Sequence, residues 1–273
     1  MKNIKSISIT ATLLLVISCA TNPFSGKQTM ALVSDSQIFP SAFQQYSQFL
    51  ASNKVLDGTK DAIRVTNIGT KIKIAAEKYL NANGRQGYLK DYQWDYKLVE
   101  SKEVNAWCMP GGKIVVYSGI LPIAKDDAGL AAILGHEVAH ALANHGQQRM
   151  SAGMLQQIVG MGLGVAVSEK SPETQQAFMQ AYGLTTQFGA MMPFSRSHES
   201  EADKIGLTLM AIAGYNPENA IYIWERMSAS SGGQAPPEFM STHPSNSTRI
   251  ANIRSLIGSA KSEAAKFGVT TFK

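Results

Sequence analysis

The motif His136-Glu137-x-x-His140 constrains this chain more than any other stretch. It lies within an apolar i, i+3, i+4 pattern that begins at Asp127 and predicts a buried helix capped by Asp126 or Asp127. A helix brings histidines four residues apart onto one face, where both rings can bind one zinc ion. Glu137 projects about 100° away, so its carboxylate can act as general base on a water at the metal.

The alternative is a core helix with two hydrogen-bonded histidines and no metal. The chain has only 5 histidines in 273 residues, and two of them fall at this spacing around a glutamate. Because that combination is the signature of a zinc peptidase helix, we predict one zinc ion per chain.

A zinc peptidase needs a third protein ligand. A third histidine six residues after the second is excluded because that position is Gly146, and His145 lies about 140° from His140 by the helical period. Glu199 and Asp203 lie four residues apart on a later predicted helix and share a face. One can bind zinc while the other accepts a hydrogen bond from a ligating histidine. The competing interpretation is an acidic helix N-terminus without a metal.

The N-terminus resembles a bacterial lipoprotein signal. A basic start and an apolar run that ends at Ile17 predict a cleaved signal peptide over residues 1–18, too short for a stable membrane span. The following Cys19 completes a lipobox-like sequence, which predicts lipidation of that cysteine, with ordinary cleavage nearby as the alternative. Ala20 replaces the aspartate that resembles an inner-membrane retention signal. We therefore expect a lipid anchor on the periplasmic side of the outer membrane.

Charge argues against nucleic acid as a partner. Loss of the signal peptide removes Lys2 and Lys5 and lowers the formal net charge from +5 to +3, with the remaining basic residues scattered. Only Cys108 would then remain unmodified, so no intramolecular disulfide is expected. With 44% apolar residues, the chain suits one globular domain. The expected division is a lipidated tether over 19–45, a metallopeptidase domain over 46–258 and a tail over 259–273.

A small sheet is expected within a mainly helical α+β domain. Alternating patterns over Tyr92–Val99 and Lys113–Ser118 predict strands, and Pro-Gly-Gly predicts a turn or bulge within Asn105–Gly112. We expect an exposed edge strand beside the active-site cleft, where an extended substrate would pair with it. Its residues are Lys113, Ile114, Val115, Val116 and Tyr117.

The segment from Met150 to Phe194 is rich in glycine and methionine. Its apolar stretch is too weak and short to cross a membrane. Methionine at helical spacing usually marks a core, but a mobile lid that covers the cleft is the more specific hypothesis.

Four motifs follow one another in the order of a known family. They are Asn105-Ala106 with Pro110-Gly111-Gly112, then His136-Glu137-x-x-His140, then Arg196-x-x-Glu199-x-x-Ala202-Asp203, and finally His243-Pro244 with Arg249-Ile250. Over roughly residues 22–257 the chain resembles the HtpX and CAAX-prenyl-endopeptidase family of gluzincin metallopeptidases, in particular its soluble periplasmic lipoprotein branch. Neither the membrane-spanning helices nor the C-terminal helical-repeat domain of some relatives is expected.

The resemblance implies a zincin-like fold and specific roles. It implies that Glu199, rather than Glu201, is the third zinc ligand and that Asp203 is the residue behind the ligands. It also implies an endopeptidase that degrades misfolded or misassembled envelope proteins, with outer-membrane assembly machinery as a further partner. One alternative is a chaperone-like assembly factor with little proteolysis. Another is a structural lipoprotein, disfavoured because structural zinc sites usually have a fourth Cys or His ligand.

His243 and Arg249 form a histidine and arginine pair around a predicted turn and helix start, with Pro244 restricting the turn. Both side chains can donate hydrogen bonds to a developing oxyanion, so we predict a catalytic role for the pair. Alternatively, His243 caps the helix or packs in the core. In a third hypothesis it occupies the open position of zinc at rest and moves away for substrate.

Overall fold

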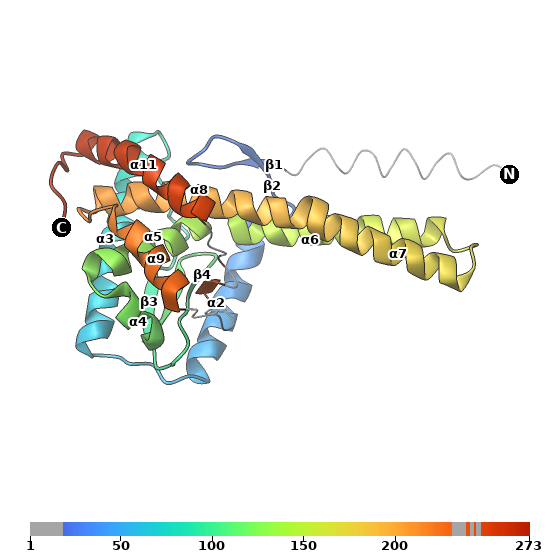
Figure 1. The fold of residues 1–273 in the computed structure, drawn as a ribbon, viewed down its shortest axis with the longest axis horizontal. Coiled ribbons are helices and arrows are strands. Elements are labelled where there is room, and N and C mark those ends of the chain that lie inside the picture. The colour runs from blue at the N-terminus through green and yellow to red at the C-terminus, as the bar shows by residue number, and fades with distance from the viewer. Residues whose placement is uncertain (1–18, 231–238, 241–242, 244–246) are drawn as a thin grey trace.

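The computed structural model of this chain describes residues 19–230, 239–240, 243 and 247–273. They form a body of helices around a small sheet, from which a pair of long helices projects (Figure 1). The expected mainly helical α+β class is confirmed. Among the described residues, no helix is long and apolar enough to cross a membrane. The predicted signal peptide, residues 1–18, lies outside the described residues.

The main sheet has three strands in the order β3-β5-β4. Strand β5 (Lys113–Tyr117) pairs in parallel with β3 (Asp95–Val99) and antiparallel with β4 (Ala106–Met109). The prediction that Lys113–Tyr117 is an exposed edge strand is therefore wrong. Its run of three β-branched residues is fully buried, as expected for a central strand covered on both faces.

The strand that displaces β5 from the edge is β4, which the sequence did not reveal. The Pro-Gly-Gly segment suggested a turn over all of residues 105–112, but the turn begins only after Met109. Gly111 and Gly112 make it possible because their φ angles are +83° and +87°, which glycine adopts without steric cost. The residues before the turn are thus free to pair with β5 as an edge strand.

Helix α5 (Asp127–Leu142) carries the two motif histidines through the middle of the body. The Asp126 side chain accepts a hydrogen bond of 2.8 Å from the Gly129 backbone N–H, which confirms the predicted N-terminal cap. Almost all of α5 is buried, so its apolar pattern has no solvent-facing side.

Helix α8 (Met192–Ile212) packs against α5 through glycine on both sides. A Cβ placed on Gly206 would lie 2.9 Å from the backbone nitrogen of His136. Gly135 is equally close to the backbone of Gly206. This contact brings the carboxylates of α8 within reach of the histidines of α5.

The remaining helices of the body enclose this pair. Helix α3 (Lys60–Ala82) packs on α5 and β3, and α9 (Asn219–Ser230) packs on α5. A short connection after β5 contains the 3₁₀ turn η2 (Ser118–Ile120) and helix α4 (Leu121–Ala124). Together they complete one hydrophobic core around α5.

The expected C-terminal tail over 259–273 is instead part of the body. Helix α11 (Ser247–Lys266) continues past that boundary and buries Ala260 and Ala264. The last residue, Lys273, exchanges backbone hydrogen bonds of 2.9 Å with Gly214 and Asn216. The prediction was wrong because alanine in a polar helix gives a weak apolar signal.

The expected tether over 19–45 is also wrong. Strands β1 (Cys19–Thr21) and β2 (Gln28–Met30) form a hairpin, and helix α2 (Asp35–Ala51) follows it. Ile38 and Phe39 of α2 are buried in the core. Pro40 and several serines suggested a linker, but they lie in or beside the first turns of an amphipathic helix.

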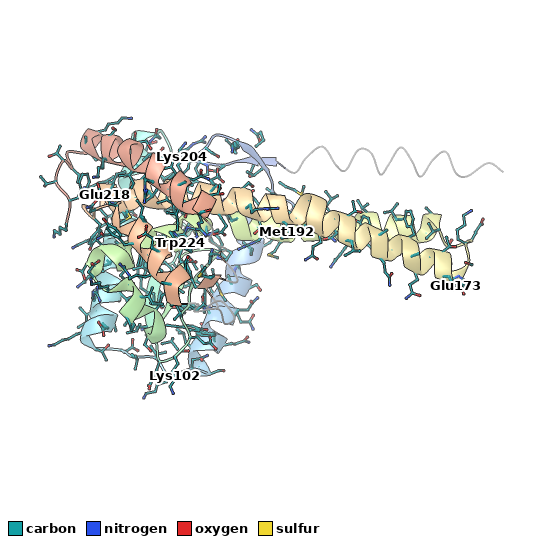
Figure 2. All side chains as sticks on the ribbon, viewed as in Figure 1. Lys102, Glu173, Met192, Lys204, Glu218 and Trp224 are labelled. Atoms are coloured by element: carbon teal, nitrogen blue, oxygen red, sulfur yellow. The ribbon has the colours of Figure 1, made fainter. Side chains whose placement is uncertain are left out.

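The expected lid over Met150–Phe194 is not a cover over the cleft. Helix α6 (His145–Ala166) and helix α7 (Pro172–Thr186) form a hairpin that extends away from the body (Figure 1). Glu173 marks the far end of this hairpin (Figure 2). The π-helical segment η3 (Gln187–Met191) leads from α7 back into α8.

Candidate metal centre

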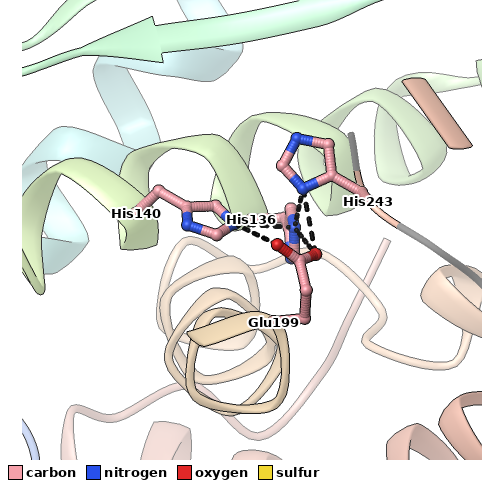
Figure 3. A group of neighbouring side chains, drawn as sticks. All are labelled: His136, His140, Glu199 and His243. Atoms are coloured by element: carbon pink, nitrogen blue, oxygen red, sulfur yellow. Dashed lines mark hydrogen bonds and ion pairs between the residues drawn. The ribbon is translucent and has the colours of Figure 1, made fainter. Parts of the chain in front are cut away.

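His136 and His140 lie one turn apart on α5 with their rings directed at the same point (Figure 3). Their Nε2 atoms are 3.1 Å apart, and both side chains are buried. Two imidazole lone pairs that face each other at this distance need a shared proton or cation between them. The helical spacing therefore directs the two ring nitrogens to one point, as predicted.

Glu199 of α8 faces the two histidines. Its Oε2 lies 3.2 Å from His136 Nε2 and its Oε1 lies 3.3 Å from His140 Nε2. Asp203, one turn further along α8, instead contacts the opposite nitrogen of His136, with 3.0 Å between Oδ1 and Nδ1. The geometry thus separates the two carboxylates whose roles the sequence left open.

His243 joins the group from the segment before α11. Its Nδ1 is 3.2 Å from His136 Nε2 and 2.9 Å from Glu199 Oε2. The neighbouring Pro244, expected to restrict this turn, lies outside the described residues. Ligand atoms of His136, His140, Glu199 and His243 all lie within 4.8 Å of one another and can together hold a metal ion.

The spacing of these atoms fits a tetrahedral zinc site. Zinc binds imidazole nitrogen and carboxylate oxygen at about 2.0–2.2 Å, so the corners of a tetrahedron lie about 3.3–3.5 Å apart. The contacts given above between ligand atoms range from 2.9 to 3.3 Å, at or slightly below that spacing. Two or three imidazoles with one carboxylate are also the donor set that zinc prefers. The residues present therefore fit the ion.

Arg249 lies behind the cluster and forms a bidentate pair with Asp203. Its Nε and Nη2 donate to the two carboxylate oxygens at 2.8 and 2.7 Å. Its Nη1 lies 3.2 Å from Glu199 Oε2, and the guanidinium stacks 3.7 Å from the ring centroid of Trp224. These contacts fix Arg249 against the carboxylates of α8, so the geometry favours a positioning role over the expected contact with substrate.

The electrostatics differ between the two motif histidines. Burial opposes protonation of both rings, but hydrogen bonds to Asp203 and Glu199 raise the pKa of His136 to about 9. Burial prevails at His140 and lowers its pKa well below the ordinary value. Burial would raise the pKa of Glu199, but hydrogen bonds from the three surrounding histidines lower it. The site thus holds an ionised carboxylate among imidazoles, as a cation site requires.

Glu137 is buried beside the cluster without belonging to it. Its Oε1 lies 3.4 Å from His243 Nε2 and makes no hydrogen bond to any part of the chain that the structure describes. Burial raises the pKa of its carboxyl above the ordinary value. A buried carboxylate oxygen without a donor is costly unless it meets a ligand, so this atom is available for proton transfer.

A second group of polar side chains adjoins His140 and was missed by the sequence reasoning. The Nδ1 atoms of His145 and His140 are 2.9 Å apart, and His145 Nε2 lies 3.0 Å from Glu201 Oε2. His145 was placed on another face because the helical period was continued past His140. The structure ends α5 at Leu142 and turns the chain at Asn144, whose φ is +57°. No local pattern other than the asparagine signals this turn.

Comparison with known proteins agrees with the geometry. The model of Peptidase family M48 matches residues 72–257. The mitochondrial metalloendopeptidase OMA1 of Schizosaccharomyces pombe is 36% identical over 174 residues, which cover 63% of this chain and 49% of that protein. The Saccharomyces cerevisiae OMA1 is 33% identical over 199 residues, 70% of this chain and 54% of that protein.

Bacterial proteins also match. The metalloprotease YcaL of Escherichia coli is 30% identical over 167 residues, 61% of this chain and 63% of that protein. The chain spans about half the length of the two OMA1 proteins described. The family match covers more than half of the chain and includes both helices that carry the cluster. The chain therefore belongs to Peptidase family M48, a family of zinc metallopeptidases.

Proposed function

We propose that this chain is a zinc-dependent endopeptidase that cleaves unfolded or misfolded proteins. The observation that carries the proposal is the buried Glu137 carboxylate, with an unbonded Oε1 beside a cluster that fits zinc. A structural metal site would have no use for a buried base at its border. The metalloendopeptidase relatives support the same reaction.

In this proposal His136, His140 and Glu199 hold the ion. When bound, zinc supplies Lewis acidity that polarises the scissile carbonyl and makes a water molecule more acidic. Glu137 accepts the proton of the attacking water at its carboxylate and delivers it to the leaving amine. The pKa of Glu137 is raised, and a carboxyl whose pKa lies nearer to neutral pH can both accept and return a proton more readily.

His243 occupies the remaining corner of the cluster in this conformation. Its Nδ1 lies as close to Glu199 as the other histidine nitrogens do, which favours the hypothesis that it is a resting ligand. Substrate would then displace His243 from that position. If so, His243→Ala binds zinc less tightly and cleaves faster. A loss of kcat with unchanged zinc affinity would instead support a donor role alone.

Strand β4 is the more suitable edge for an extended substrate. It lies at the end of the sheet and packs against α5, which carries Glu137. An edge strand presents unpaired backbone groups that a peptide can join as a further strand. We therefore propose that an extended substrate pairs with Ala106–Met109 and not with Lys113–Tyr117. Proline in place of Cys108, whose backbone N–H faces the open edge because the Trp107 N–H is directed at β5 in this register, should raise KM more than it lowers kcat.

The proposed location is the periplasmic side of the outer membrane, with a lipid attached to Cys19. The lipobox-like sequence before that residue supports it, as does similarity to the beta-barrel assembly-enhancing protease of Escherichia coli, which is 27% identical over 164 residues. The OMA1 relatives are mitochondrial and support a different compartment. Labelling with a radioactive fatty acid tests whether the protein carries the lipid anchor that the outer-membrane location requires. Wild type should incorporate label and Cys19→Ala should not, whereas an unlabelled wild-type protein would contradict the anchor.

The deciding experiment is cleavage of an unfolded protein by Glu137→Gln, with zinc content measured on the same samples. The amide keeps the size of the side chain but cannot accept the proton, so kcat should fall about 10³-fold with full zinc content. The exposed change Glu225→Gln is the matched control and should leave both values unchanged. Retained turnover in Glu137→Gln would exclude the mechanism. A wild type that binds zinc but leaves unfolded proteins intact would favour the assembly-factor alternative.

A second experiment tests the ligand assignment. Glu199→Ala should lose zinc, because the carboxylate is a direct member of the cluster. Glu201→Ala should retain zinc under saturating conditions, because that carboxylate lies behind His145. Equal zinc content in the two variants would mean that Glu199 is not a ligand.

A further inference from the structure

We propose that His145 and Glu201 are positioning residues that hold His140 in the orientation required for zinc. The inference rests on the proposed role of His140 as a ligand. The three side chains form a line of hydrogen bonds, from His140 Nδ1 to His145 Nδ1 at 2.9 Å and from His145 Nε2 to Glu201 Oε2 at 3.0 Å. His140 Nε2, the other nitrogen of the ligand, is the atom that faces the metal cluster.

Only one arrangement of protons satisfies every contact in this line when zinc is present. A lone pair on His140 Nε2 is required for the metal, so Nδ1 carries the proton and donates a hydrogen bond to His145 Nδ1. His145 must then be neutral with its proton on Nε2, which donates to the Glu201 carboxylate.

Packing leaves the His145 ring little freedom to leave this line. Its exposed fraction is 0%, and its ring stacks on His198 with 4.1 Å between centroids and 10° between planes. The same Glu201 oxygen, Oε2, also accepts a hydrogen bond of 3.1 Å from Asn22 Nδ2. Asn22 is itself buried in the turn between β1 and β2. The N-terminal hairpin thus contributes to the support of the metal cluster.

The two ligating histidines are therefore supported in different ways. Asp203 contacts His136 directly and is fixed by Arg249. His140 reaches its carboxylate only through a second imidazole. In both cases a negative charge lies behind the ring and increases the basicity of the nitrogen that binds the metal.

His198 provides the internal comparison. It is as buried as the motif histidines and packs on the same ring, but its Nε2 donates to Gln148 and its Nδ1 has no hydrogen-bond partner among the described residues. A histidine that only fills the core would resemble His198. His145 differs because both of its nitrogens lie on the line that ends at His140.

The experiment measures zinc affinity by competition with a chelator for wild type, His145→Phe, His145→Asn and His198→Phe. Phenylalanine preserves the stack on His198 but removes the acceptor, so zinc should bind about 10- to 100-fold more weakly. In His145→Asn the amide oxygen takes the position of Nδ1 and can accept from His140, which should restore affinity to within several-fold of wild type. His198→Phe should bind zinc as wild type does.

Two further measurements separate positioning from a merely structural role. The absorption bands of bound Co²⁺ should shift in His145→Phe and return towards wild type in His145→Asn, because they report ligand geometry. Thermal unfolding of the metal-free proteins should be similar for His145→Phe and His198→Phe. Unchanged zinc affinity in His145→Phe, or equally weak binding in His145→Asn, would overturn the inference. A wild type that binds no zinc would instead refute the proposed function.

Discussion

The body and the α6–α7 hairpin differ in how far they bury the apolar side chains of their helices. In the body, α5 buries nearly every residue and touches α8 through glycine backbones. In the hairpin, α7 buries none of its residues, and Met161, Val165 and Leu184 are 66%, 75% and 60% exposed. Both regions carry apolar residues at helical spacing, yet one forms the core and the other a projecting surface.

This difference indicates where the free energy of folding is concentrated. The body combines buried apolar area with a network of polar contacts around one cluster, so a change at one residue affects many others. The hairpin depends on contacts between two helices and on the propensity of each. Changes in the body should therefore act globally, and changes in the hairpin locally.

Removal of zinc should have the largest effect and should be confined to the body. At a zinc concentration about 1,000-fold above the dissociation constant, binding stabilises the folded state by about 4 kcal/mol. A chelator should therefore lower the unfolding midpoint by roughly 10 °C. Hydrogen exchange should accelerate in α5, α8 and the first turn of α6, and stay unchanged in the rest of α6 and in α7. Equal acceleration in both regions would show that the hairpin is coupled to the metal cluster.

Gly206→Ala should have the next largest effect. The added methyl group would lie 2.9 Å from backbone atoms of Gly135 and His136, so the two helices must separate. Overpacking of this kind destabilises a protein by about 2 kcal/mol. Chemical denaturation measures the change, and zinc affinity should fall with it because the carboxylates of α8 move with the helix. Wild-type stability would mean that the contact is less tight than the structure indicates.

Tyr88→Phe tests the boundary between the two regions. The Tyr88 hydroxyl donates to the Leu142 carbonyl at 3.2 Å and accepts from Asn144 at 3.1 Å, where α5 ends and α6 begins. Loss of these bonds should lower the free energy of unfolding by about 1 kcal/mol.

The same substitution predicts a dependence on pH. Burial, followed by the charge of Asp35, raises the pKa of Tyr88 from 10.0 to about 12. The advantage of wild type over Tyr88→Phe should be fully present below pH 10 and decline as the pH rises towards 12, because the unfolded phenol ionises first. Chemical denaturation of both proteins at pH 8, 10 and 11 measures this difference in the free energy of unfolding. A constant advantage would contradict the raised pKa.

Gly162→Ala in α6 should have the smallest effect and the opposite sign. A Cβ at this position would meet nothing within 4 Å, so only helix propensity changes. Alanine should stabilise the local helix by about 0.8 kcal/mol. Slower hydrogen exchange within α6 and slower proteolysis of the hairpin are expected, with no change in zinc affinity. Destabilisation would indicate that the hairpin packs more tightly than its exposure suggests.

Sequence reasoning succeeded where a function depends on contacts within one helix. The cap at Asp126 and the convergence of His136 and His140 follow from helical geometry alone. It failed where the outcome depends on which segments become neighbours. A central β5, a body that includes α11 and a projecting α6 and α7 all depend on long-range packing that apolar periodicity does not encode.

The spacing of His136, Glu137 and His140 is enough to indicate the family and the chemistry of the centre, because it acts through a local and rigid helix. Tertiary structure decided the rest. The contact between Gly135 and Gly206 brings Glu199 to the histidines, and the turn at Asn144 returns His145 to His140. Those outcomes need the simultaneous packing of distant segments, so no pattern along the chain could specify them.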